Sequence, residues 1–327
     1  MVQSGLHPPD LRRAWLAWGA VCVIWGTTYL AIKVALTTIP PFLVGGLRYL
    51  AAGAILGSVL WTRGDRVPPR ATWPGFLLLG LLMFGVGNGG VVWAEIWIDS
   101  GLAAVVIATT PFWMVGVEAL LPHGERLTRW HMAGLLIGFL GIVLLVGPSL
   151  ARGGSHASRT IAGVAALQLA CAGWAAGSAY GKRHAARVSP GMSAAAQMLC
   201  GGVVMLAAGT LHGEWAQLRF SGASTAALVY LTLAGSIAAF GAYIYALAHL
   251  PVSIVSLYAY INPIIAVALG TLLLGEAFDE RMLVAIAVIL VGLAVVSWAR
   301  RAPPPTPARD AGRAGDDTRA PRDASLR

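Results

Sequence analysis

Apolar residues occur in ten long runs along the chain, and short polar stretches separate one run from the next. Most runs approach the roughly 20 residues that an α-helix needs to cross the hydrocarbon core of a bilayer. Lipid offers no hydrogen-bond partner to an open backbone, and the runs lack the short alternation of a transmembrane barrel. The pattern therefore predicts an all-α integral membrane protein with ten transmembrane helices. We place them at residues 14–34, 41–62, 74–96, 101–121, 129–147, 160–181, 190–211, 224–247, 252–274 and 281–299.

Many features of the first half of the chain return in the second half at an almost constant spacing. The matching pairs are Cys22/Cys171, Trp25/Trp174, Lys33/Lys182, Gly89/Gly241, Ala94/Ala246 and Pro111/Pro263. Each half holds five predicted helices, and an odd number places the second copy upside down in the membrane. Inverted repeats are a signature of secondary transporters, whose substrate site lies near the midplane where the copies meet. We therefore expect one repeat over 14–147, a linker loop over 148–159 and a second repeat over 160–299.

The positions of Lys and Arg predict how the chain is oriented. With the N-terminus inside the cell, most Lys and Arg residues of the gaps fall on the cytoplasmic side, as the positive-inside rule requires. We therefore expect residues 1–13 to form a cytoplasmic N-terminal segment and residues 300–327 to form a basic cytoplasmic tail. The tail is rich in Pro, Arg and Asp without apolar periodicity, so we expect it to be disordered.

Composition excludes a soluble globular protein. Hydrophobic residues make up 57% of the 327 residues and charged residues only 11%, whereas soluble domains carry about 25% charged residues. The formal net charge of +9 largely reflects the cytoplasmic bias, so it does not indicate nucleic-acid binding. The three cysteines lie in apolar runs without metal-ligand spacing, and no phosphate-binding loop occurs. We expect no metal, no cofactor and no ATP-driven step.

Several stretches resemble a known family. The first half contains WGTTYLAIK from Trp25, then Arg48, SGLAAVVIATTPFW and GERL, and the second half contains INPIIAVALGTLLLGE. Together they resemble the EamA-type family of the drug/metabolite transporter superfamily, and the resemblance covers residues 14–299. It implies a ten-helix carrier of the bacterial inner membrane, usually an exporter of amino acids, metabolites or toxic compounds.

The repeated prolines and Gly-Glu pairs are candidates for architectural or functional roles. Pro111 and Pro263 fall inside predicted helices, where each would free the carbonyl one turn back, at Ile107 and Ala259. Those carbonyls could bind substrate or could be satisfied by neighbouring helices, and both interpretations stay open. We interpret two pairs as structural motifs that favour a helix N-terminus: Gly124-Glu125 and Gly275-Glu276.

Acidic and amide side chains inside the runs are expensive in lipid, so each needs a partner or an aqueous cavity. Glu95 and Asn88 share one helical face. Glu95 could take up a proton or meet a substrate amine, or it could neutralise Arg48 or Lys33. Glu118 lies nearer a helix end, where snorkelling is easier, and is a second candidate for proton coupling.

Aromatic residues with polar neighbours form the last candidate site. Such rings suit a pocket for an amphipathic or cationic solute, although they also form belts at membrane interfaces. We expect the deep-lying residues to line a central cavity together with the polar and proline positions above. The predicted substrate contacts are Trp25, Thr28, Tyr29, Asn88, Glu95, Pro111, Trp174, Tyr243, Tyr258, Asn262 and Pro263.

These observations favour a secondary transporter over other membrane proteins. We expect the chain to export a small organic solute, such as an amino acid, a metabolite or a drug, by alternating access around the central cavity. The alternatives are a channel, a facilitative uptake permease and an intramembrane enzyme. An enzyme is the weakest of these, because no metalloprotease motif or nucleophile grouping lies at membrane depth.

Overall fold

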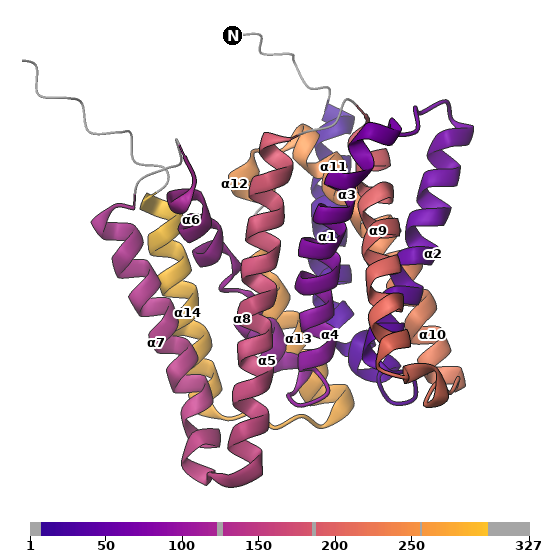
Figure 1. Cartoon of the computed structure of the whole chain (residues 1–327). Helices are drawn as coiled ribbons and strands as arrows, with labels where there is room; N and C mark the ends of the chain where they lie inside the picture. Colours follow the sequence, from indigo (N-terminus) through magenta and orange to yellow (C-terminus); the bar gives the residue numbers. More distant parts are fainter. Residues whose placement is uncertain (1–7, 123–126, 185–187, 256, 300–327) are drawn as a thin grey trace, which may run out of the picture.

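The computed structural model describes residues 8–122, 127–184, 188–255 and 257–299. These residues form helices and short connections without a strand among them, which confirms the predicted all-α class (Figure 1). Nine helical segments of this described part are long and apolar enough to cross a membrane, and one shorter apolar helix of 17 residues accompanies them.

The two halves use the same order of elements. The first half contains α1 (Pro8–Ala35), α2 (Pro41–Thr62), η1 (Arg70–Thr72), α3 (Trp73–Leu79), η2 (Gly80–Asn88), α4 (Gly89–Ala94), α5 (Ser100–Ile107), α6 (Thr110–Leu120) and α7 (Arg129–Arg152). The second half contains α8 (Gly154–Arg183), α9 (Pro190–Leu211), η3 (Glu214–Ala216), α10 (Gly222–Tyr230), η4 (Leu231–Ala238), α11 (Ala239–His249), α12 (Val252–Val255), α13 (Tyr258–Leu274) and α14 (Glu280–Ala299).

Two runs predicted as continuous helices are interrupted. The run 101–121 is divided into α5 and α6, so Pro111 is the second residue of α6 and does not lie in a helix interior as predicted. Proline is tolerated there because the first turn of a helix has no use for its missing N–H. The run 252–274 is divided into α12 and α13, and Pro263 does lie inside α13.

The connection between the halves is shorter than the sequence suggested. Residues 148–159, expected as a linker loop, are helical except at Gly153, where α7 gives way to α8. Gly153 has a φ of 66°, a left-handed conformation that glycine adopts without steric cost. The turn is therefore tight enough to bring α7 and α8 side by side.

A π-helix occurs in the third span of each half, at η2 and η4. Polar side chains bond carbonyls five residues back: Asn88 Nδ2 donates to Met83 O at 3.1 Å, and Ser236 Oγ donates to Leu231 O at 3.0 Å. Such segments are rare and often occur at functional sites. Hydrophobic periodicity does not reveal them. A π-helix differs from an α-helix in bonding residue i to residue i+5, and this difference leaves no mark in a run that is apolar throughout.

The second half is inserted upside down relative to the first. In Figure 1, α1 and α8 run in opposite directions, and so do α7 and α14. Equivalent helices of the two halves pack against each other, α2 against α9 and α7 against α14. The α2–α9 contact is close because of glycine: a Cβ on Gly53 would lie 2.8 Å from Leu199 N, and one on Gly202 would lie 2.5 Å from Leu50 N.

The first helix of each half packs mainly against the other half. Helix α1 contacts α10, η4, α11 and α13, and we call this group the α1 bundle. Helix α8 contacts α3, η2, α4, α5 and α6, and we call this group the α8 bundle. Each bundle therefore contains elements of both repeats.

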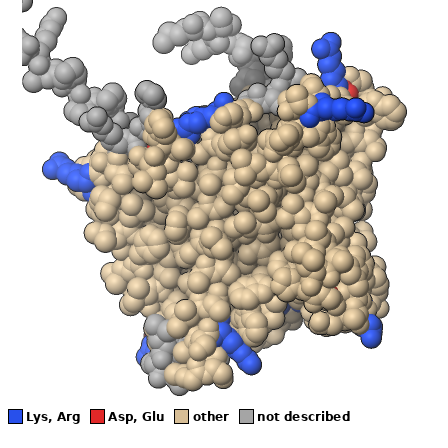
Figure 2. Space-filling model, viewed as in Figure 1, with Lys and Arg blue, Asp and Glu red and all other residues tan. Residues whose placement is uncertain are grey.

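The outer surface fits a lipid environment. Figure 2 shows Lys and Arg side chains near both ends of the visible face, with an uncharged band between them. Many large apolar side chains remain exposed, among them Leu16, Leu136, Val143 and Leu283, each more than half exposed. Exposed apolar surface on this scale is unusual in soluble proteins and is expected where lipid covers it.

Candidate functional site

Three of the predicted substrate contacts meet in one aromatic cluster. Trp25 of α1 lies 5.3 Å from Tyr243 of α11 and 4.9 Å from Tyr258 of α13, measured between ring centroids, and the two tyrosines are 6.0 Å apart. Trp25 Nε1 donates to the carbonyl of Gly235 in η4 at 3.2 Å. We call these three rings the Trp25 cluster. All three belong to the α1 bundle.

Trp174 lies in a second aromatic group. Its ring contacts Phe84 of η2 at 6.4 Å, and Phe84 in turn contacts Tyr49 of α2 at 4.7 Å. We call these rings the Tyr49 cluster. The repeat marks Trp174 as the equivalent of Trp25, but it marks neither Tyr49 nor Phe84, because neither aromatic residue recurs in the other half.

Arg48 joins the two clusters. Its guanidinium lies over the Tyr49 ring, 4.7 Å from the centroid, and its Nε donates to Ser236 Oγ at 2.8 Å. Ser236 follows Gly235, which holds Trp25. The Arg48 side chain is buried. The ion pair with Glu95 that the sequence allowed is not formed, since Arg48 is held by η4 and not by the end of α4.

Glu95 is fully buried, with 1% of its surface exposed, and neither carboxylate oxygen has a hydrogen-bond partner among the described residues. Lys33 Nζ does not bond the carboxylate: it donates to the backbone carbonyls of Glu95 at 2.6 Å and Ile98 at 2.7 Å. The ammonium group thus caps the end of α4, an arrangement favoured by the helix dipole.

Other predicted polar contacts bond to the backbone near the Trp25 cluster. Thr28 Oγ1 donates to Trp25 O at 2.6 Å. The Asn262 amide nitrogen, placed to face two carbonyls, donates to Cys22 O and Tyr258 O, both at 3.1 Å. Asn262 thereby ties α13 to α1. These polar groups position the aromatic rings in the state that the structure shows.

Tyr29, Pro111 and Pro263 are three further predicted substrate contacts, and none of them contributes a ring to the Trp25 cluster. Tyr29 packs against a buried apolar cluster that includes Ala94 and Leu167. The carbonyl of Ile107, expected to be free below Pro111, accepts from Thr110 Oγ1 at 2.6 Å. Pro263 is buried inside α13.

Glu276 caps a helix of the other repeat. Its carboxylate accepts hydrogen bonds from Ser100 N at 2.8 Å, Ser100 Oγ at 2.7 Å and Gly101 N at 3.0 Å, at the start of α5. Gly275 ends α13 with a φ of 66° and turns the chain toward Glu276. The Gly124-Glu125 pair lies outside the described residues.

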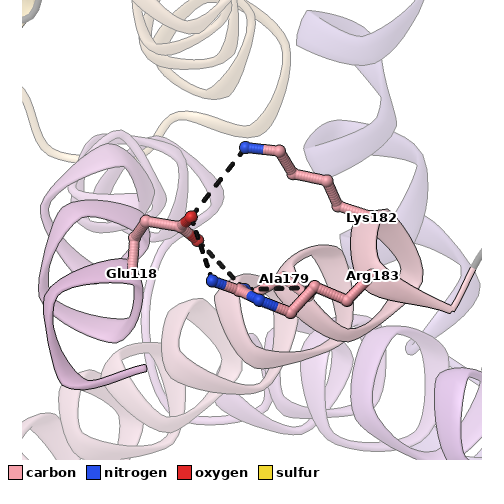
Figure 3. A network of polar contacts seen from close by, with 4 residues as sticks. All are labelled: Glu118, Ala179, Lys182 and Arg183. Atoms are coloured by element: carbon pink, nitrogen blue, oxygen red, sulfur yellow. Dashed lines mark hydrogen bonds and ion pairs between the residues drawn. The ribbon is translucent and has the colours of Figure 1, made fainter. Parts of the chain in front are cut away.

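Glu118 forms the ion pairs shown in Figure 3. Its Oε1 lies 3.2 Å from Arg183 Nη2 and 3.9 Å from Lys182 Nζ, so α6 and α8 are linked near their ends. The Lys182 side chain is 76% exposed. Partly exposed pairs of this kind contribute little to stability.

A cavity of about 230 Å³ lies near the end of the molecule where α5 begins and α13 ends. Its polar lining includes Asp99, Thr160, Glu276 and Arg281. None of the predicted substrate contacts lines it. The aromatic clusters and Arg48 are packed together away from this cavity.

Comparisons with known proteins agree with this architecture. The EamA-like transporter family matches residues 14–147 and again 161–298. An uncharacterized inner membrane transporter of Escherichia coli K12, YedA, is 36% identical over 279 residues, which cover 85% of this chain and 88% of that protein. A probable amino-acid metabolite efflux pump of Salmonella typhimurium is 25% identical over 285 residues, which cover 84% of this chain and 91% of the pump.

One solved crystal structure, 25% identical in sequence, superposes with a TM-score of 0.62 and covers 88% of this chain and 97% of its own. That structure therefore shares the fold described above. With two family matches that together span most of the chain and a relative above 30% identity, this protein is a membrane transporter and belongs to the EamA-like transporter family.

Proposed function

We propose that this protein is a secondary transporter that exports a small organic solute across the bacterial inner membrane by alternating access. The repeats over 14–147 and 160–299 provide the two related halves, and both termini face the cytoplasm. The named efflux pump among its relatives supports outward transport. The positive-inside bias supports the orientation.

One observation carries the alternating-access mechanism: two repeat-related lysines are in different states. Lys33 corresponds to Lys182, at the spacing that also relates Trp25 to Trp174. The carbonyls that Lys33 binds, at Glu95 and Ile98, correspond to those of Leu247 and Leu250, at the spacing that relates Ala94 to Ala246. Lys33 holds both of its carbonyls. Lys182 is largely exposed and approaches only Glu118.

The Lys33 contact crosses from one bundle to the other. Lys33 belongs to α1, whereas the carbonyls follow α4 of the α8 bundle. This contact, together with the Glu276 cap on α5, holds the bundles together at one end of the molecule. In the alternate state, Lys182 takes the carbonyls of Leu247 and Leu250 while Lys33 releases its own. Two states of similar free energy are what alternating access requires.

Glu95 provides a candidate coupling group at this contact. Its backbone carbonyl accepts from the Lys33 ammonium, and its buried carboxylate has no hydrogen-bond partner among the described residues. Release of Lys33 in the alternate state changes the charge that faces Glu95, so a proton bound in one state is released in the other. Exchange of a proton for solute would then drive export.

The alternating states can be tested by labelling two repeat-related positions that leave both lysines intact. Trp97 and His249 are equivalent positions of the two repeats and lie beside the two sets of carbonyls in the sequence. Each is replaced by cysteine in a background lacking the buried Cys22, Cys171 and Cys200. We expect conditions that increase maleimide labelling at 97, such as a reversed pH gradient, to decrease it at 249. Labelling that rises and falls together at both positions would contradict alternating access.

Transport itself is tested in proteoliposomes. A carrier gives saturable solute flux and accelerated exchange when solute is present on both sides. A channel gives flux that does not saturate and shows no such acceleration.

A further inference from the structure

Arg48 is a buried cation that forms no ion pair with any residue that the structure describes. Only 5% of its surface is exposed. Among the residues that the structure describes, its interactions are one hydrogen bond, from Nε to Ser236 Oγ, and the contact with the Tyr49 ring. The ion pairs of the described part all involve Glu118. A charge in the membrane interior is costly unless it is paired, so an unpaired one indicates a function.

The architecture of the helix pair does not require this charge. Arg48 of α2 corresponds to Gln197 of α9, at the spacing that also relates Trp25 to Trp174, and α2 and α9 pack against each other with matching glycines. Gln197 is neutral and donates to Ser193 Oγ within its own helix at 3.0 Å. The cation is therefore a departure from the repeat symmetry, as expected of a residue that meets an asymmetric substrate.

The terminal amino groups of Arg48 have no hydrogen-bond partner among the residues that the structure describes. Its Nε is taken by Ser236, which fixes the plane of the guanidinium, and neither Nη group has a partner in the described part of the chain. A planar guanidinium presents two parallel N–H donors that match a carboxylate. The Tyr49 cluster lies on one side of Arg48, and on the other side Gly235 connects to the Trp25 cluster.

We propose that Arg48 is the substrate-recognition residue of the transporter, that it binds the carboxylate of an organic monoanion, and that the apolar body of this solute packs against the two aromatic clusters. The inference rests on the proposed transport function and narrows its substrate class. A single positive charge balances one carboxylate. A dianionic phosphate would need a second cation, and Lys33 is occupied by backbone carbonyls. A purely cationic solute would be repelled, which revises the expectation of a cationic drug.

The test measures thermal unfolding of the purified protein with four probes of similar size: phenylacetate, phenylacetamide, phenethylamine and benzylphosphonate. A solute that binds only the folded state raises the melting temperature in a concentration-dependent manner. We expect phenylacetate to raise it, and the neutral amide and the amine to leave it unchanged at equal concentration. A response to the amine, or no response to either anion at millimolar concentration, would overturn the proposal. A larger response to benzylphosphonate would overturn the assignment of a carboxylate.

Three variants separate recognition from folding. In Arg48→Met, we expect the melting temperature without probe to stay the same or rise, since an unpaired buried charge is removed, while the phenylacetate response is lost. If Arg48→Met instead lowers the melting temperature and keeps the response, Arg48 is structural. Ser236→Ala should weaken phenylacetate binding about tenfold while retaining the preference for the anion. Gln197→Met, the repeat-related control, should respond like the original protein.

A parallel flux measurement with radiolabelled phenylacetate in proteoliposomes distinguishes the two levels of the proposal. Binding that depends on Arg48 without saturable flux would overturn the transport function and keep the recognition site. Saturable flux of neutral or cationic solutes that is unchanged in Arg48→Met would keep the transporter and overturn the recognition site.

Discussion

At the scale of single residues, three buried charged side chains are satisfied in different ways. Lys33 binds two backbone carbonyls, Arg48 binds a hydroxyl and an aromatic face, and the Glu95 carboxylate has no hydrogen-bond partner in the described chain. Burying a charged group costs several kcal/mol, roughly, unless its hydrogen bonds are replaced. The three residues are therefore unequal, and substitution should affect each of them differently.

The two repeat-related lysines give a matched pair of substitutions. Lys33→Met removes two hydrogen bonds from a charged donor and should lower the stability of the described state by about 2 kcal/mol or more. Lys182→Met removes one long, exposed ion pair and should have an effect below about 1 kcal/mol. Thermal unfolding in one detergent measures both. Equal losses would show that the two lysines occupy equivalent environments, contrary to the structure.

Glu95→Gln keeps the size of the side chain and removes the exchangeable proton. We expect this variant to lose pH-gradient-driven transport in proteoliposomes and to retain solute exchange without a gradient. The Glu118→Gln variant, at the exposed ion pair, is the control and should retain both activities. Gradient-driven transport that persists in Glu95→Gln would remove Glu95 from the coupling mechanism.

At the scale of elements, close packing of equivalent helices depends on small residues. Membrane helices approach closely where glycine lies at their contact, because lipid provides no hydrophobic drive between them. Gly202 of α9 and Gly53 of α2 place backbone against backbone. Elsewhere, caps cross between the repeats: Glu276 caps α5, and Glu214 caps α2 by accepting from Phe42 N and Leu43 N. The halves are therefore joined at helix contacts and at helix ends.

A pair of Gly→Ala substitutions tests the helix contact. The Cβ of Gly202→Ala would meet Leu50 N at 2.5 Å, so we expect a loss of about 1–3 kcal/mol from overpacking. The Cβ of Gly57→Ala, on α2, would lie 3.6 Å from Ala195 Cβ, an ordinary contact. That variant should be neutral or gain up to about 1 kcal/mol from higher helix propensity. Chemical or thermal unfolding measures the stability of both variants. Equal stabilities would refute the close α2–α9 contact.

At the scale of the whole molecule, the two bundles combine elements of both repeats. This crossing means that a movement between the bundles changes the environment of α1 and α8 together. The Lys33 contact and the Glu276 cap lie where α1 and α13 end, whereas the Glu118 ion pairs lie near the ends of α6 and α8, at the opposite end of the bundles (Figure 1). In the proposed mechanism, a change of state would open the end held by the Lys33 contact and close the opposite end.

The orientation of the molecule can be measured independently of transport. We expect a fluorescent protein fused after residue 299 to fluoresce and an alkaline phosphatase fused there to be inactive, because both report a cytoplasmic C-terminus. Fusions after Thr38, between α1 and α2, should give the opposite result. An active phosphatase at residue 299 would contradict the proposed orientation. The Lys33 contact would then lie on the cytoplasmic side of the membrane.

Much of the architecture followed from local pattern. The length and apolar character of the runs predicted helices, because lipid leaves the backbone no other way to satisfy its hydrogen bonds. The recurrence of Trp25 at Trp174 and of Lys33 at Lys182 revealed the repeat, and the odd helix number implied its inversion. The breaks at Ala108 and before Tyr258 were missed, since an apolar run looks the same whether its helix is continuous or divided.

Only part of the candidate site could be predicted from the sequence. Trp25, Tyr243 and Tyr258 were selected separately for their rings and depth, and the fold places them in one cluster. Tyr49 and Ser236 were not selected, because an aromatic or a hydroxyl residue inside an apolar run carries no local mark of its partner. The sequence left open whether Glu95 neutralises Arg48 or Lys33, and the fold brings Ser236 to Arg48 and the Lys33 ammonium to the backbone carbonyl of Glu95.

The sequence by itself thus determined the class, the helix number and the inverted relation of the halves, because these depend on composition and on spacing along the chain. Only the tertiary structure decided that the first helices pack across the repeats, that Lys33 and Lys182 differ, and that Arg48 stays unpaired. These features depend on which groups meet across long stretches of the chain, for example 62 residues between Lys33 and Glu95 and 188 between Arg48 and Ser236. Equivalent positions of the two repeats, such as Lys33 and Lys182, occupy different environments once the two halves pack together. The proposed mechanism rests on that difference.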